Sequence, residues 1–167
     1  MEKITPFLWF DDQAEEAANF YVDVFTTRRA AHAGGGDSKI LDVTRYGEGG
    51  LGAPGSAMSV SFVLEGQAFT ALNGGPARAF TEAISFLVRC QSQEEVDELW
   101  AALCDGGEQG RCGWLKDRYG LSWQIVPDRL MELLGDPDPE RSQRVLQAML
   151  QMSKIDVPTL ERAAEAA

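Results

Sequence analysis

An internal repeat is the sequence feature that most limits what this chain can fold into. A strand-like run, an amphipathic helix and further strand-like runs occur twice, with the two helices about 80 residues apart. One copy alone would leave one face of its sheet bare, so the duplication favours two similar modules that pair their sheets. We therefore predict an α+β fold of two modules, each a strand, a helix and further strands, followed by a helical tail.

The first module is read from hydrophobic spacing. Residues 4–10 form a mostly buried strand, and one helix face then carries Ala14, Ala17, Ala18, Tyr21 and Phe25. Residues 28–46 suggest two strands separated by the glycines at 34–36. The apolar runs 57–64 and 68–72 follow, joined by a hairpin turn.

The second module repeats this order and ends in a different kind of segment. Residues 83–88 form a strand, Ser92 and Glu95 form a capping box, and a helix face carries Val96, Leu99, Trp100 and Leu103. Two strands are expected at 112–116 and 121–126, again joined by a turn. We expect a single domain composed of module 1–76, module 82–127 and a helical tail 128–167. In the tail, 136–139 supplies a cap and a proline for the first turn of one helix, and a last short helix covers 156–166.

Composition excludes several classes of partner. The net charge is −11, so phosphate backbones and anionic lipid surfaces would repel the chain, and a nucleic-acid or membrane partner is not expected. No run of about 18 apolar residues occurs, so no membrane span is expected, and no export signal is visible at the start of the sequence. The three cysteines have no metal-site spacing, which is typical of reduced thiols in the cytoplasm, where we place the protein.

Candidate ligand-binding residues fall on the strands and turns. Cys112, Trp114 and Lys116 alternate onto one face of their strand, and Ser122 and Gln124 share a face of the next. Cys112 is either a nucleophile or a small packed residue.

Other candidates also have a structural alternative. Asn73 either orients a ligand or serves the turn at 73–76. Trp9, Trp114 and Trp123 either form an aromatic pocket or pack in the core.

Three long stretches together resemble one family. They are residues 6–17 (Pro-Phe-Leu-Trp-Phe-Asp-Asp-Gln-Ala-Glu-Glu-Ala), 66–76 (Gly-Gln-Ala-Phe-Thr-Ala-Leu-Asn-Gly-Gly-Pro) and 112–127 (Cys-Gly-Trp-Leu-Lys-Asp-Arg-Tyr-Gly-Leu-Ser-Trp-Gln-Ile-Val-Pro). The sequence resembles the PhnB-like family, often labelled demethylubiquinone methyltransferase-like, of the vicinal oxygen chelate superfamily that includes glyoxalases and bleomycin-resistance proteins. The resemblance covers nearly the whole chain and implies an α+β fold of two paired βαβββ modules. It also implies homodimers with sites inside a concave sheet. It also implies that Ser122 and Gln124 point into that cavity.

The resemblance also directs attention to metal ligands. Metal-binding relatives carry His, Glu or Gln at four strand positions, and the last of these matches Gln124. The other three positions fall near Pro6–Phe7, near Ala83–Ser85 with Glu82 close by, and at Ala71 or Leu72. Iron sites of this kind need two histidines and catalytic zinc sites usually contain histidine, whereas this chain has only His32, beside a glycine-rich turn. We predict no firmly bound metal and no cofactor.

The function expected from these observations is binding or transformation of a small molecule in the concave cavity of a homodimer. One alternative is a methyltransferase-type enzyme, as the family label implies. No methyl-donor motif is visible, since the glycine clusters lie between strands rather than before a helix, so enzymatic activity stays open. Another alternative is a protein that sequesters an antibiotic or toxin, and a third is an interaction scaffold whose cavity is filled by tryptophans.

Overall fold

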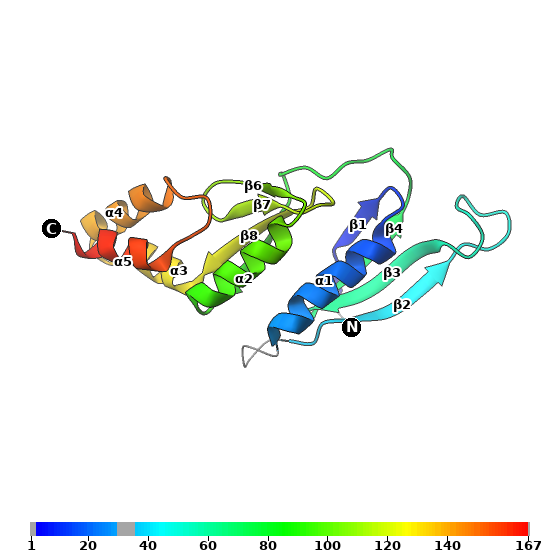
Figure 1. Ribbon diagram of the computed structural model, residues 1–167, viewed down its shortest axis with the longest axis horizontal. Coiled ribbons are helices and arrows are strands. Elements are labelled where there is room, and N and C mark those ends of the chain that lie inside the picture. Colours follow the sequence, from blue (N-terminus) through cyan, green and yellow to red (C-terminus); the bar gives the residue numbers. More distant parts are fainter. Residues whose placement is uncertain (1–2, 30–35, 167) are drawn as a thin grey trace. The chain divides into compact units, whose positions relative to one another are not determined.

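The first repeat forms a four-stranded sheet covered by one helix. The computed structural model describes residues 3–29 and 36–166, which separate into two compact units, Met1–Phe80 and Thr81–Ala167 (Figure 1). The first unit contains, in order, β1 (Phe7–Phe10), α1 (Ala14–Arg29), β2 (Lys39–Arg45), β3 (Ala57–Leu64) and β4 (Gln67–Asn73). Its strand order is β1-β4-β3-β2, with β1 parallel to β4 and the other pairs antiparallel.

The second repeat has the same topology. It contains, in order, β5 (Phe86–Cys90), α2 (Gln93–Cys104), β6 (Glu108–Gln109), β7 (Trp114–Lys116) and β8 (Ser122–Pro127). The sheet order is β5-β8-β7-β6, with β5 parallel to β8 and the other pairs antiparallel. The predicted α+β fold of two βαβββ modules is therefore confirmed, while their union in one domain stays a prediction.

Hydrophobic spacing explains how α1 packs on the first sheet. All five residues of the predicted helix face are buried, and Tyr21 stacks on Phe62 of β3 with ring centroids 6.4 Å apart. Phe62 in turn stacks on Phe69 of β4 at 5.3 Å. Side chains alternate along a strand, so the same pattern leaves the other face of this sheet free of α1.

The start of α2 is fixed by the predicted capping box. Ser92 Oγ accepts a hydrogen bond from the Glu95 N–H at 3.2 Å, and the Glu95 carboxylate accepts one from the Gln91 N–H at 2.7 Å. The predicted apolar face of α2 is buried in the unit's core, at Val96, Leu99, Trp100 and Leu103. This packing assigns one face of the second sheet to α2.

The tail belongs to the second unit. It consists of α3 (Asp128–Leu134), α4 (Pro139–Met149) and α5 (Val157–Glu165), and the last two begin at Asp138 and Asp156 as N-caps. These helices share a core with the end of β8, made of Val126, Leu130, Leu133, Val145, Ile155, Leu160 and Ala164. The Gln93 side chain also ties α2 to the tail, since it donates to the Ile155 carbonyl at 3.1 Å and accepts from the Val157 N–H at 2.7 Å.

Several predicted boundaries need correction. Residues 28 and 29 continue α1 instead of starting a strand, and residues 30–35 lie outside the described part of the chain. The strand predicted from Cys112 begins only at Trp114, while β6 and α3 were not predicted. Within the described ranges, no helix is long and apolar enough to cross a membrane.

Candidate functional site

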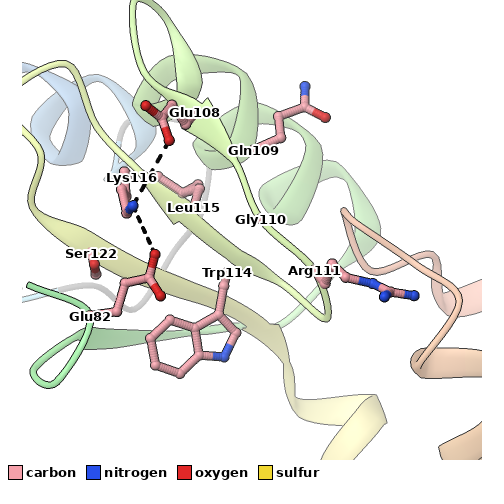
Figure 2. A pocket seen from close by; sticks show the side chains of 9 residues that line it. All are labelled: Glu82, Glu108, Gln109, Gly110, Arg111, Trp114, Leu115, Lys116 and Ser122. Atoms are coloured by element: carbon pink, nitrogen blue, oxygen red, sulfur yellow. Dashed lines mark ion pairs between the residues drawn. The ribbon is translucent and has the colours of Figure 1, made fainter.

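A pocket lies on the second sheet, on the face that α2 does not cover. It has a volume of about 240 Å³ and takes its walls from β6, β7, β8 and the turn before β5 (Figure 2). Side chains with functional groups line it at Glu82, Glu108, Arg111, Trp114, Lys116 and Ser122. Because Trp123 and Ile125 of β8 are buried on the α2 side, the alternating Ser122 faces the other way, toward the pocket.

Lys116 is the electrostatic centre of the pocket. Its ammonium lies 2.8 Å from a Glu82 carboxylate oxygen and 3.9 Å from one of Glu108, so the two carboxylates flank it (Figure 2). The hydrogen bond and charge of Glu82, together with the charge of Glu108, raise the pKa of Lys116 above its ordinary value. Lys116 is therefore a cation at neutral pH, neutralised mainly by a carboxylate from a turn.

Ser122 is a buried hydroxyl without a partner. It is only 1% exposed, and its Oγ makes no hydrogen bond within the described part of the chain. A buried polar group left unsatisfied costs about 1–3 kcal/mol, and most such groups in proteins are paired. The hydroxyl therefore has unused capacity for a hydrogen bond at the pocket wall.

Strand register places Ser122 beside Lys116. The two residues are directly opposite in the antiparallel β7–β8 pair, and Trp114 is likewise opposite Gln124. Opposite residues share a sheet face, with Cβ atoms roughly 4.5–5.5 Å apart. A hydroxyl, an ammonium and an indole ring are thus neighbours on one surface.

The rim of the pocket is anchored to the tail. Arg111 Nη2 donates to the Leu150 carbonyl at 3.1 Å, and Figure 2 shows its side chain directed away from Lys116. The Gly110 N–H donates to the Trp114 carbonyl at 2.8 Å, and a Cβ on Gly110 would lie 2.7 Å from that oxygen. Glycine at 110 allows β6 and its loop to approach β7 closely enough to close this side of the pocket.

The structure brings together three of the residues predicted for the site, Trp114, Lys116 and Ser122. Gln124 shares their face, but its Nε2 donates to Ser85 Oγ at 2.8 Å, and it is outside the described pocket lining. Trp123 packs in the core, where its Nε1 donates to the buried Asp117.

Cys112 is placed differently from the prediction. It precedes β7 in a left-handed conformation with φ of 55°, so it does not alternate with Trp114 and Lys116 on one strand face. Its N–H donates to the Met152 carbonyl at 2.8 Å, and its Sγ lies 3.6 Å from the Met149 carbonyl oxygen. These contacts attach the loop to the tail, and they were not visible from strand periodicity.

Trp9 and Asn73 lie in the first unit and have structural partners there. Asn73 Oδ1 accepts from the Ala14 N–H at 2.7 Å, and its Nδ2 donates to the Ala57 carbonyl at 3.0 Å. Trp9 Nε1 donates to the Gly75 carbonyl at 2.8 Å, and the Arg78 guanidinium lies 5.4 Å from the centre of its ring. Asn73 thus joins α1, β3 and β4, and a ligand-binding role for either residue stays a prediction.

Two carboxylates of the site were harder to predict than the strand residues. In the sequence, Glu82 lies close to a possible ligand position near Ala83–Ser85, and no pattern singles out Glu108. Glu82 lies in a turn and Glu108 on a two-residue strand, and neither segment has a periodic pattern that would show where its side chain points. Only the tertiary fold brings them to Lys116.

The next feature is the distribution of side chains that could bind a metal ion among the described residues. Across 3–29 and 36–166, no three His, Cys, Asp or Glu side chains are grouped so that they could hold a metal ion. His32 lies outside the described residues. The amide of Gln124, at the position that the resemblance assigns to a ligand, is instead hydrogen-bonded to Ser85.

Two βαβββ units of this topology form the class of fold that the sequence resemblance implied, that of the vicinal oxygen chelate superfamily. Within that class, the chain belongs to the family described as 3-demethylubiquinone-9 3-methyltransferase, the PhnB-like family, which matches residues 2–126. No curated protein matches the chain.

Solved structures agree with this assignment. A PhnB protein from Bacillus cereus is 34% identical with a TM-score of 0.65, covering 75% of this chain and 99% of its own. Protein PA1353 from Pseudomonas aeruginosa is 21% identical with a TM-score of 0.58, over 77% of this chain and 100% of its own. The fosfomycin resistance protein FosX from Listeria monocytogenes is 18% identical with a TM-score of 0.56, over 81% and 98%. The last two similarities concern the fold alone.

Proposed function

We propose that this protein binds a small organic molecule in the pocket on the second sheet, and that it does so as a cytoplasmic homodimer without a firmly bound metal. The observation that carries the proposal is the buried Ser122 hydroxyl, which lies at the pocket wall with no hydrogen-bond partner in the described chain. The oxygen is covered in the unliganded protein, so a ligand would satisfy it once a neighbouring side chain of the pocket moves aside. The neighbouring Trp114 and Lys116 offer an apolar wall and a charge to the same ligand.

Replacement of Ser122 separates this role from a structural one. Ser122→Ala removes the unsatisfied hydroxyl with little change in volume, so the unliganded protein should be as stable as the wild type or slightly more stable. Ligand binding should weaken in the same variant. Loss of stability without loss of binding would show that the hydroxyl serves the fold and would contradict the proposal.

Methyl transfer is a second candidate, favoured by the description of the family that matches residues 2–126. The glycine cluster at 47–50 lies in the loop between β2 and β3. A methyl donor usually binds at a glycine-rich turn between a strand and a helix. Calorimetric titration with S-adenosylmethionine decides between the two. Saturable binding of the donor, with methylation of a bound acceptor, would favour the enzyme over a binding protein.

Sequestration of an antibiotic or toxin differs from catalysis in its product. A sequestering protein would bind one ligand per pocket and release it chemically unchanged after denaturation. Mass spectrometry of the released ligand distinguishes this outcome from turnover.

A further inference from the structure

The pocket residues restrict the chemistry of the ligand. Lys116 can only donate hydrogen bonds, and the Ser122 hydroxyl opposite it has a hydrogen available to donate. A single ligand atom that contacts both must therefore be an acceptor. Because Lys116 is a cation, an anionic oxygen gains more from this position than a neutral one.

The Glu82 carboxylate that pairs with Lys116 can be replaced by an anionic group of a ligand. Glu82 belongs to a turn before β5, and its side chain is 66% exposed. Exposed ion pairs of this kind contribute little to stability, so an incoming anion can replace one at small cost. Glu108, at 3.9 Å, is beyond hydrogen-bond distance and contributes mainly charge.

The Trp114 indole would contact the part of the ligand that lies away from Lys116. It lies two residues from Lys116 on β7 and on the same face, a separation of roughly 6–7 Å along the strand. This distance is about the length of an aromatic ring with one substituent. The half-buried indole offers a flat apolar surface for such a body.

We propose that the ligand is a small planar organic acid, whose anionic oxygen displaces Glu82 from Lys116 and accepts a hydrogen bond from Ser122 while its apolar body packs on Trp114. This inference rests on the proposed function. A cationic ligand held by Glu82 and Glu108 is the competing arrangement. It would place a second positive charge beside Lys116 and could not accept a hydrogen bond from the ammonium.

The test uses series of probes that share an aromatic body and differ in the head group and its charge. Benzoate, 1-naphthoate and 3-phenylpropanoate are compared with their primary amides and with the corresponding amines. Binding to the full chain is followed through the indole N–H signal of Trp114 in ¹H–¹⁵N spectra, assigned with Trp114→Phe. We expect the acids to bind more tightly than their amides, and the amines to bind most weakly.

Two charge-matched variants then identify the exchanged carboxylate. Glu82→Gln should strengthen binding of the acids about twofold to fivefold and should affect the neutral amides less. Glu108→Gln removes the same charge at greater distance and should have a smaller effect. Lys116→Met should weaken binding of the acids about tenfold or more and abolish their preference over the amides.

The possible outcomes distinguish failure of this inference from failure of the proposed function on which it rests. Binding of amides or amines with no preference for acids, or an unchanged acid affinity in Glu82→Gln, would overturn the inference and leave a binding pocket in place. If no probe perturbs the Trp114 signal at millimolar concentration, the proposed function itself is contradicted. Acid binding that strengthens in Glu82→Gln supports both.

Discussion

Trp123 donates its indole N–H to the buried carboxylate of Asp117 at 2.9 Å, across the turn that joins β7 to β8. The other carboxylate oxygen accepts from the Tyr119 N–H at 2.8 Å and the Leu121 N–H at 3.1 Å. Asp117 is only 3% exposed, so these donors replace its hydration. The interaction fixes the hairpin that carries Lys116 on one strand and Ser122 on the other.

Replacing this carboxylate should therefore destabilise the second unit. Asp117→Asn places an NH₂ group against one of the N–H donors and should lower the free energy of unfolding by about 1–3 kcal/mol, measured by urea denaturation. Asp105→Asn is the matched control, because its partner Arg118 forms an exposed ion pair that should change stability by about 0.5 kcal/mol or less. Equal effects of the two variants would argue against a structural role for the buried carboxylate.

Ser122→Ala and Ser85→Ala form a second pair of contrasting variants. Ser85 Oγ accepts a hydrogen bond from Gln124, so loss of this hydroxyl should lower the free energy of unfolding by about 1 kcal/mol. Loss of the unpartnered Ser122 hydroxyl should cost nothing in the unliganded protein. Thermal unfolding with and without a bound ligand checks this, and a ligand-dependent rise in Tm should be smaller in Ser122→Ala than in Ser85→Ala.

Asn73 provides a test of a residue that was predicted as part of the site. Because its amide joins Ala14 to Ala57, Asn73→Ala should destabilise the first unit by about 2–3 kcal/mol. Asn73→Asp keeps the acceptor for Ala14 but loses the donor to Ala57, so its cost should differ from that of the alanine variant. A loss of ligand binding at unchanged stability would instead favour a direct role in the site.

The N-cap of α5 gives a prediction for pH dependence. Hydrogen bonds from the Thr159 side chain and backbone hold the pKa of Asp156 below its usual range. Its ionised form is therefore favoured in the folded protein, and this stabilisation is present above the unfolded pKa of about 3.9. As the pH falls below that value and through the lower folded pKa, the stabilisation is lost.

The variant Asp156→Asn removes the charge at this position but keeps a side chain that can cap α5. Asparagine is also a good N-cap residue but does not titrate, so the variant should keep most of its stability near neutral pH. The stability difference between wild type and Asp156→Asn should then shift toward the variant as the pH is lowered from about 5 to 3. A pH-independent difference would show that the charge of Asp156 does not contribute.

The sequence alone was sufficient for those parts of the fold that have periodic patterns. The spacing of Tyr21 and Phe25 identified α1, and Ser92 with Glu95 identified the start of α2, because a helix must bury one face and satisfy its first N–H groups. It was insufficient where one or two residues decide the structure. Cys112 adopts a left-handed turn against the tail, a conformation that depends on tertiary contacts with Met152.

The site could be predicted to a similar extent. Strand alternation, with the family resemblance, was enough to predict that Trp114, Lys116 and Ser122 share one sheet face, whereas their role in binding stays a prediction. Glu82 could not be assigned to Lys116, because a turn residue reaches a strand only through the path of the chain in three dimensions.

Native mass spectrometry of freshly purified wild-type and Ser122→Ala protein, combined with elemental metal analysis, tests the central claim most directly. We expect a wild-type dimer that carries a small organic molecule and no stoichiometric metal, and a Ser122→Ala dimer depleted of that molecule. A stoichiometric metal, or the same bare mass for both proteins, would contradict the account of a metal-free binding pocket centred on Ser122.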